Sequence, residues 1–253
     1  MPTFEASDGV RLRFEDRGEG PPILLIHGFA SNRRVNWDET SWIEALSEAG
    51  FRVLVPDLRG HGESDKPRET SSYAMRRMAQ DQFELLDHLR LNRIVAMGYS
   101  LGGRIAAHMA VFHPERIAAL IIGGLGDQLT KGLPQADAIA AGLRAPKAAE
   151  VEHPLAAGFR AFAERTGADL EALAACMEAG RANLTPAQLA GLDMPVLIAV
   201  GEEDEVAGDP QNLAEMIQGA ELALIARRDH MKAVGDKAHK AAVLSFLERL
   251  GHG

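Results

Sequence analysis

The chain has 253 residues, of which 46% are hydrophobic and 25% are charged, and this composition is typical of a globular protein that buries a full core. Its formal net charge of −9 argues against nucleic acid or an anionic membrane as a partner, because both bind basic surfaces. The single cysteine, Cys176, cannot form an internal disulfide. The first residues lack the basic and apolar segments of a signal peptide, and no apolar run approaches the ~18 residues of a membrane span. We therefore expect a cytoplasmic protein with no nucleic-acid or membrane partner, and the sequence leaves its oligomeric state open.

The predicted elements alternate between short apolar strands and longer amphipathic helices. The first segment alternates apolar and polar residues around Asp8-Gly9, which predicts a β-hairpin. The apolar runs expected to form strands are 21–28, 51–57, 93–100, 117–124, 195–201 and 221–229. The helical patterns around them are 38–49, 74–90, 101–113, 210–218 and 235–250. Continuous apolar character is expected of strands that are covered on both faces, so this order predicts an α/β fold around a mostly parallel sheet.

One long segment breaks this alternation. Residues 127–190 show no strand pattern, only alanine-rich helical stretches such as AAGFRAFAERTG and DLEALAACMEAG. The segment is too long for an ordinary crossover loop, and its leucine and phenylalanine content disfavours a disordered linker. We therefore predict a small helical cap at 127–190, inserted into a core domain that is formed by residues 1–126 and 191–253.

The segment Gly98-Tyr99-Ser100-Leu101-Gly102 lies where a predicted strand ends and a predicted helix begins. A serine in such a sharp corner projects its hydroxyl above the sheet, and the small residues on both sides let strand and helix approach closely. The N-terminus of the helix also favours a developing oxyanion. The pattern predicts that Ser100 is a nucleophile, and the alternative is a structural glycine turn.

A serine hydroxyl is a weak nucleophile without a general base, and the base needs a carboxylate to orient it. Asp204 follows the strand at 195–201 and His230 follows the next strand, which gives the order Ser, Asp, His. Asp127, after the strand at 117–124, is the alternative acid. We favour Asp204 because Gly201 offers a turn that directs its carboxylate inward. Of the other histidines, we expect structural hydrogen bonds at His27 and His61, and surface positions for His88, His113, His239 and His252.

An oxyanion would need two backbone donors near the nucleophile. The glycine turn at His27-Gly28-Phe29 follows an early strand, and Leu101 follows the nucleophile. We therefore expect the N–H groups of Phe29 and Leu101 to form the oxyanion hole. In the cap, Phe159 and Phe162 are candidate substrate contacts, and the alternative is that both only pack the cap onto the sheet.

Together these motifs resemble the α/β-hydrolase superfamily. The segments that carry the resemblance are HGFA at 27–30, PDLRGHGES at 56–64, GYSLGG at 98–103, HPERIAALIIGG at 113–124, PVLIAVGEED at 195–204, and His230. The resemblance implies an eight-stranded, mostly parallel sheet with helices on both faces and a cap over the site. It also implies that Asp57 and residues 59–62 order a loop near the site and do not react. One departure is that Arg227, Arg228 and Asp229 precede His230, where many relatives have glycines.

The residues also favour one chemistry among those of the superfamily. Relatives that open epoxides or displace halide use an aspartate at the position of Ser100, and those that open epoxides add tyrosines from the cap. Here the two tyrosines, Tyr73 and Tyr99, lie outside the predicted cap, and the sequence has no metal-binding or phosphate-binding motif. We predict a serine hydrolase that needs no cofactor or metal, namely a carboxylesterase acting on small or medium acyl esters. Hydrolysis of a carbon–carbon bond, perhydrolysis, and a ligand sensor with little turnover are the alternatives.

Overall fold

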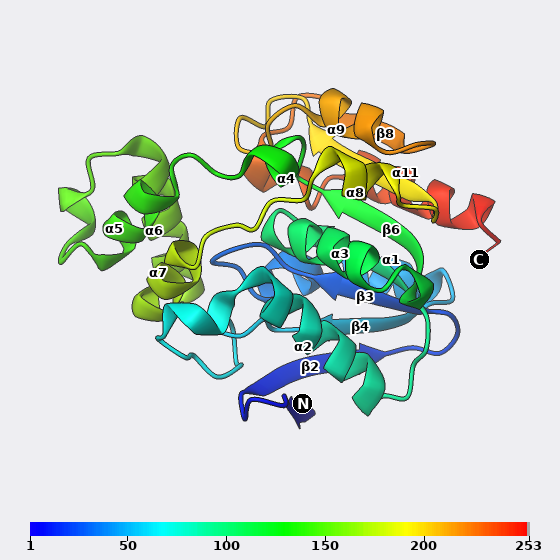
Figure 1. Ribbon diagram of the computed structural model, residues 1–253, viewed down its shortest axis with the longest axis horizontal. Coiled ribbons are helices and arrows are strands. Elements are labelled where there is room, and N and C mark those ends of the chain that lie inside the picture. Colours follow the sequence, from blue (N-terminus) through cyan, green and yellow to red (C-terminus); the bar gives the residue numbers. More distant parts are fainter. Residues whose placement is uncertain (252–253) are drawn as a thin grey trace.

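The structure, a computed structural model, describes residues 1–251 and is organised around one eight-stranded sheet (Figure 1). Its strands are β1 (Thr3–Glu5), β2 (Arg11–Arg17), β3 (Pro22–Ile26), β4 (Arg52–Pro56), β5 (Ile94–Tyr99), β6 (Ile117–Gly123), β7 (Val196–Gly201) and β8 (Glu221–Ile225). They lie in the order β1-β2-β4-β3-β5-β6-β7-β8. The pairs β1–β2 and β2–β4 are antiparallel, and all other neighbours are parallel. The predicted fold class, a mostly parallel eight-stranded α/β-hydrolase sheet, is confirmed.

The helices cover both faces of this sheet. They are α1 (Trp42–Glu48), α2 (Met75–His88), α3 (Leu101–Phe112), α4 (Gln128–Lys131), α5 (Ala136–Arg144), α6 (Pro154–Thr166), α7 (Leu170–Glu178), α8 (Pro186–Ala190), α9 (Pro210–Met216), α10 (His230–Ala233) and α11 (Lys237–Arg249). Shorter turns are the π-helical η1 (Arg34–Asp38) and the 3₁₀ turns η2 (Thr70–Tyr73), η3 (Pro114–Arg116) and η4 (Ala148–Glu150). The predicted strands and helices are all present, with ends that differ by a few residues.

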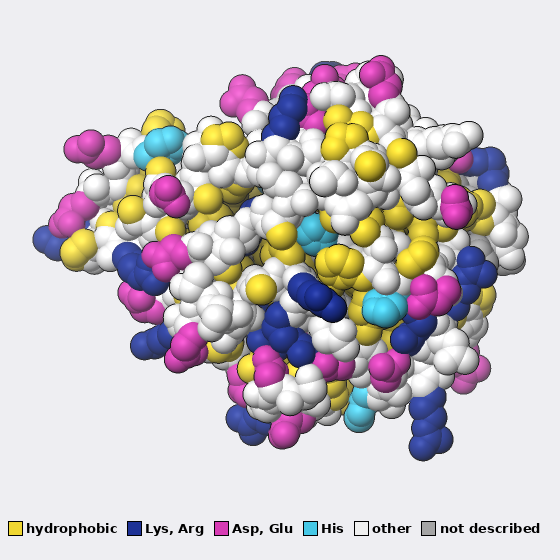
Figure 2. All heavy atoms as spheres, viewed as in Figure 1, with side chains coloured by type: hydrophobic (Ala, Val, Ile, Leu, Met, Phe, Trp, Pro, Cys, Tyr) yellow, Lys and Arg dark blue, Asp and Glu magenta, His cyan; other side chains and the backbone are white. Residues whose placement is uncertain are grey.

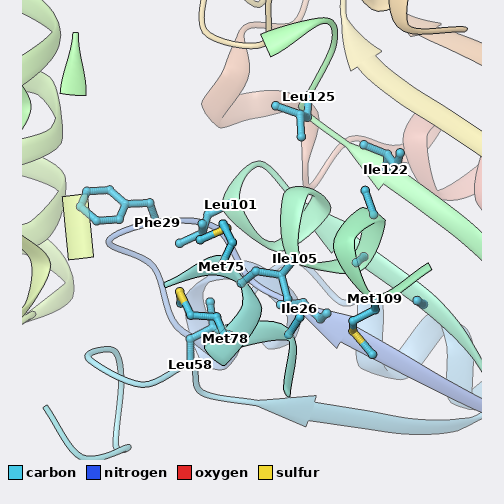
Figure 3. Close-up of a cluster of buried hydrophobic side chains, with 14 of the residues drawn as sticks. Ile26, Phe29, Leu58, Met75, Met78, Leu101, Ile105, Met109, Ile122 and Leu125 are labelled. Atoms are coloured by element: carbon cyan, nitrogen blue, oxygen red, sulfur yellow. The ribbon is translucent and has the colours of Figure 1, made fainter. Parts of the chain in front are cut away.

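Successive residues of each central strand pack into two different cores. In β3, Leu24 and Ile26 contact the cluster under α2 and α3, whereas Ile23 and Leu25 contact the cluster under α1 and α11. Figure 3 shows the first cluster, with Ile26 of β3 beside Ile105 and Met109 of α3. Because both faces are buried, these strands have continuous apolar sequences, which is why they could be recognised.

Within the described residues, the segment between β6 and β7 contains only helices and turns. Figure 1 shows α5, α6 and α7 as a lobe beyond the end of β6, and α8 returns beside the core. In the lobe α5 packs on α6 and α7, and α7 packs on η2. The division into a cap at 127–190 and a core domain stays a prediction.

Charged side chains of both signs are interspersed with apolar ones over the face seen in Figure 2. In the part of the chain that the structure describes, no helix is long and apolar enough to cross a bilayer.

The expectation of a surface position for His239 is wrong. Its side chain is fully buried against Trp42, with ring centroids 5.1 Å apart, because the inner face of α11 packs on α1. His88 and His113 are exposed as expected, and His252 lies outside the described residues. His27, His61 and His108 are also buried. Burial lowers the pKa of His27, His108 and His239 to about 4 and that of His61 to about 3.

These buried histidines predict an acid-sensitive fold. Below pH ~6.5 the unfolded chain binds protons that the folded chain excludes until the pH approaches the lowered pKa values, so stability is lost as the pH falls. Each such histidine contributes about 1.4 kcal/mol per pH unit across that interval. We expect the thermal unfolding midpoint to fall by at least about 5 °C between pH 7 and pH 5 at constant ionic strength. His239→Asn, which keeps a donor for Ala233, should make this dependence shallower, and a flat profile in the parent protein would contradict the prediction.

Candidate active site

Ser100 occupies a strained corner between β5 and α3. Its φ is 53° and its ψ is −112°, a conformation that residues with side chains rarely adopt. A Cβ added at Gly98 would lie 2.1 Å from the Gly102 carbonyl oxygen, and one added at Gly102 would lie 1.9 Å from the Ile26 carbonyl oxygen. Only glycine therefore fits at positions 98 and 102, two residues before and after Ser100. The Ser100 N–H donates to the Gly123 carbonyl at 2.8 Å, which ties the corner to β6.

The structure brings together the three side chains that the sequence singled out. His230 Nε2 lies 3.1 Å from Ser100 Oγ, and His230 Nδ1 lies 2.7 Å from Asp204 Oδ2. The Asp204 side chain is 0% exposed and that of His230 is 10% exposed. Asp204 Oδ1 accepts hydrogen bonds from the N–H groups of Val206 and Ala207, both at 2.9 Å. The carboxylate is thus fixed on one oxygen and presents the other to the imidazole.

Asp127, the alternative acid, points to different partners. Its Oδ1 accepts from the Asp209 N–H at 3.0 Å, and its Oδ2 accepts from Asn212 Nδ2 at 2.9 Å and pairs with Lys131. These contacts join the end of β6 to the start of α9. Asp229 is also occupied elsewhere, because its Oδ1 accepts from the first N–H groups of α10 at 3.1 and 2.9 Å. Asp204 is therefore the carboxylate that contacts His230.

The loop before His230 starts earlier than expected. The predicted strand at 221–229 ends at Ile225, because the chain turns at Arg227, whose φ is +58°. An arginine thus takes a left-handed conformation in the segment where many relatives have glycines. The turn expected after Gly201 is present, since the Gly201 carbonyl accepts from the Asp204 N–H at 3.1 Å. Gly201 is also the last residue of β7, where a Cβ would lie 2.1 Å from the Arg228 carbonyl oxygen. The loop also receives a hydrogen bond from the Tyr99 hydroxyl to the His230 carbonyl at 2.6 Å.

The turn after β3 is held by a buried histidine and an asparagine. The Leu58 N–H donates to His27 Nε2 at 3.0 Å, so the proton of the neutral ring resides on Nδ1, which donates to the Gly28 carbonyl at 2.8 Å. The Gly28 N–H in turn donates to Asn36 Oδ1 at 3.0 Å. This network orders the backbone on either side of Phe29.

The N–H groups of Phe29 and Leu101 are both left free for a ligand. Within residues 1–251 neither donates a hydrogen bond to a protein acceptor. Leu101 begins α3, so its N–H is one of the first-turn groups that a helix cannot satisfy internally. Figure 3 shows the two side chains next to each other at the edge of the buried cluster, with Phe29 reaching toward the helical lobe. The arrangement offers two donors beside Ser100, as an oxyanion hole requires.

Two cavities adjoin Ser100. The main cavity has a volume of about 200 Å³, and its lining includes Asn36, Thr40, Ser100, Phe159, Phe162 and His230. The side cavity has a volume of about 40 Å³, and its lining includes Phe29, Ser100, Leu101, Arg104, Phe159 and Arg181. Phe159 borders both cavities, and its ring meets that of Phe29 edge to face with centroids 5.7 Å apart. Both aromatic residues expected in the substrate pocket thus face a cavity at Ser100.

Several further residues of this site were not predicted from the sequence. Asn36 lies in a π-helical turn and lines the main cavity, where its buried Nδ2 has no acceptor among the described residues. Arg104 and Arg181 line the side cavity. No motif marks Asn36 or Arg181, whereas the position of Arg104, one helical turn after Ser100, was a signal that could have been used. Among residues 1–251 no group of three acidic, histidine or cysteine side chains could hold a metal ion.

Comparisons with known proteins agree with this geometry. Residues 21–142 match the model of the α/β-hydrolase fold family. A hydrolase from Pseudomonas aeruginosa of known structure is 31% identical, with 97% of each chain covered and a TM-score of 0.82. A thermophilic esterase from Thermogutta terrifontis is 28% identical, with 100% of each chain covered and a TM-score of 0.79.

The similar curated sequences share a shorter region. Bifunctional epoxide hydrolase 2 of Sus scrofa is 41% identical over 115 residues, which are 44% of this chain and only 20% of that protein. The full-length likeness to the Pseudomonas hydrolase, the family match over the four strands from β3 to β6 and the eight-stranded topology lead to the same conclusion. The chain belongs to the α/β-hydrolase family.

Proposed function

We propose that the protein is a serine hydrolase that cleaves carboxylic esters through an acyl-enzyme on Ser100. The observation that carries the proposal is the continuous hydrogen-bonded series from Ser100 Oγ through the His230 ring to Asp204 Oδ2. A hydroxyl, a base and an orienting carboxylate in this geometry are suited to acyl transfer. The likeness to the Thermogutta esterase over the whole chain adds support.

The reaction has two steps. Ser100 Oγ attacks the ester carbonyl while His230 Nε2 takes the hydroxyl proton, and the N–H groups of Phe29 and Leu101 stabilise the oxyanion. The tetrahedral intermediate collapses, the C–O bond to the alcohol breaks, and His230 returns the proton to the leaving oxygen. Water then attacks the acyl-enzyme by the same route and releases the carboxylic acid. Asp204 holds the imidazole tautomer and stabilises the imidazolium that forms in each step.

The identity of the nucleophile separates this proposal from epoxide opening. A carboxylate that opens an epoxide forms an ester, which water can hydrolyse at its carbonyl. A serine hydroxyl would instead form an ether, which has no carbonyl for water to attack and would leave the enzyme blocked. Ser100 is therefore suited to esters, although curated sequence relatives are named epoxide hydrolases.

The first test is covalent labelling of the nucleophile. Fluorophosphonate should add once to the parent protein in an intact-mass measurement, and Ser100→Ala should abolish the adduct. The same variant should lower kcat for a p-nitrophenyl ester by about 10⁴-fold or more, because the three groups act as a unit. An adduct that persists in Ser100→Ala, or a parent protein that neither labels nor turns over any ester, would overturn the proposal.

A pair of matched substitutions tests the choice of acid. Asp204→Asn should lower kcat for ester hydrolysis by about 10⁴-fold, because an amide favours the wrong imidazole tautomer. Asp127→Asn makes the same change in another buried carboxylate and should keep kcat within about threefold of the parent, since Asp127 only joins β6 to α9. Both variants are compared across pH after their unfolding midpoints are measured. A silent Asp204→Asn together with an inactive Asp127→Asn would reverse the assignment.

The two aromatic residues of the lobe should set the preferred ester size. Phe159 borders both cavities and Phe162 borders only the main one, so Phe159→Ala should change the ratio of kcat/KM between short and long acyl esters more than Phe162→Ala. Each additional methylene that a pocket accepts is worth about 1 kcal/mol or more, so the shift should reach roughly tenfold. The measurement is a series of p-nitrophenyl esters from acetate to octanoate. If both variants lose thermal stability and keep the parent profile, these residues only pack the lobe.

A further inference from the structure

The side cavity contains a buried arginine without an acidic partner. Four arginines are buried in the part of the chain that the structure describes, namely Arg33, Arg59, Arg104 and Arg160. Three of them pair with carboxylates: Arg33 with Glu15, Arg59 with Asp81, and Arg160 with Glu164. For Arg104 no carboxylate oxygen lies within 4.0 Å among the described residues, and it is only 3% exposed. Its charge is therefore buried without an opposite charge beside it, which costs free energy unless another group supplies one.

Arg104 hydrogen-bonds only to neutral groups. Its Nη1 donates to the carbonyls of Leu129 and Ala182 at 3.1 and 3.3 Å, and its Nη2 donates to the Gln128 carbonyl. Burial and the nearby Arg181 lower the pKa of Arg104 to about 9. A second cation thus lies close to the first, although the chain as a whole has a formal net charge of −9.

Arg181 has N–H groups without an oxygen acceptor among the described residues. Its Nη1 donates to the Cys176 carbonyl at 2.9 Å, and its guanidinium lies over the Phe29 ring, 5.5 Å from the centroid. Within residues 1–251 it has no carboxylate within 4.0 Å, as the ion pairs of the neighbouring helices involve other arginines. A guanidinium carries five N–H groups in a planar fork that matches a carboxylate. The half-buried Arg181 lines the side cavity together with Ser100 and Leu101.

The charge and the size of the side cavity suit a small anion. Its lining contains two arginines, Gln128 and Ser100, and the other lining residues are apolar or glycine. No aspartate or glutamate is among the lining residues that the structure describes. A volume of about 40 Å³ accommodates a group of a few heavy atoms and no long chain. Apolar walls around two cations lower the local dielectric and strengthen their attraction for an anion.

The position of His230 decides which part of an ester enters this cavity. His230 borders the main cavity and is not part of the lining of the side cavity. Since the leaving alcohol must receive its proton from His230, the alcohol belongs in the main cavity and the acyl group in the side cavity. An anion held by Arg181 would therefore be carried by the acyl group.

We infer that the side cavity is a carboxylate subsite, in which Arg181 binds and Arg104 adds charge, so that the enzyme prefers half-esters of short dicarboxylic acids. This inference rests on the proposed ester hydrolysis at Ser100. The two adjoining sites require a short acyl spacer between the scissile carbonyl and the carboxylate. This requirement defines a class of substrates.

The test compares esters that differ only in the terminal group of the acyl chain. The monoethyl esters of malonic, succinic, glutaric and adipic acids are compared with ethyl esters of the monocarboxylic acids of equal length, and the released acid is measured by chromatography. At the best length, kcat/KM for the half-ester should exceed that for the neutral ester by at least about tenfold. Arg181→Gln should lower this ratio by tenfold or more, and Arg181→Lys should restore part of it. Arg93→Gln, which removes one exposed charge at the opposite end of β5, should keep the parent ratio.

A binding measurement separates failure of the subsite from failure of the proposed reaction. Calorimetric titration of Ser100→Ala with monoethyl glutarate should show binding that weakens at least tenfold when Arg181→Gln is added. If neutral esters are hydrolysed and half-esters are not preferred, or if Arg181→Gln keeps the ratio, the subsite is disproved and ester hydrolysis stands. If no ester is hydrolysed but binding depends on Arg181, the subsite stands and the proposed reaction fails.

Discussion

The close approach of β3, β5 and α3 at Ser100 is the constraint on which the rest of the site depends. Gly98 and Gly102 allow backbone atoms to meet where any side chain would clash, and Ser100 itself is held at a φ of 53°. Such a conformation costs on the order of 1–3 kcal/mol and persists only where the surroundings determine it. Here the hydrogen bond to Gly123 and the packing of the buried strands β5 and β6 supply that support. The hydroxyl is thereby fixed above the carboxyl ends of the parallel strands, where the loops after β7 and β8 deliver Asp204 and His230.

Neutral buried groups order the turn after β3, which carries Phe29. His27 is too deeply buried to ionise near neutral pH, so its ring keeps one tautomer and bonds to both Gly28 and Leu58. Asn36 fixes the opposite side of the same turn through Gly28. A cation in either position would compete with the two N–H groups for the developing oxyanion, and an anion would repel it. Neutral hydrogen-bonding groups orient the Phe29 amide without adding a charge beside it.

Most of the fold and the three central side chains could be predicted because their signals are local. Strands covered on both faces read as apolar runs, and the Ser100 corner needs glycines at fixed offsets. From the sequence, Asp204 is only preferred over Asp127, since both follow strands that end at the same edge of the sheet. The structure adds that Asp204 contacts His230 and that Asp127 has other partners. Asn36, Arg181 and the burial of His239 were not predictable, because each depends on neighbours far away in the sequence. His239 shows the limit clearly, as nothing in its own helix reveals that Trp42 covers it.

Arg104 connects the nucleophile to the lobe in a way that explains why both belong to one site. Its N–H donates to the Ser100 carbonyl at 3.0 Å, so it lies in the first turn of the helix that begins at the nucleophile. Its guanidinium bonds to the backbone at Gln128 and Leu129, where the chain leaves the core, and at Ala182, where it returns. One side chain thus fixes both connections of the lobe relative to Ser100. A lysine could supply the charge but not the planar set of donors that reaches separate carbonyls at once. The side cavity lies between these fixed parts, so its shape and its positive charge follow from the same residue.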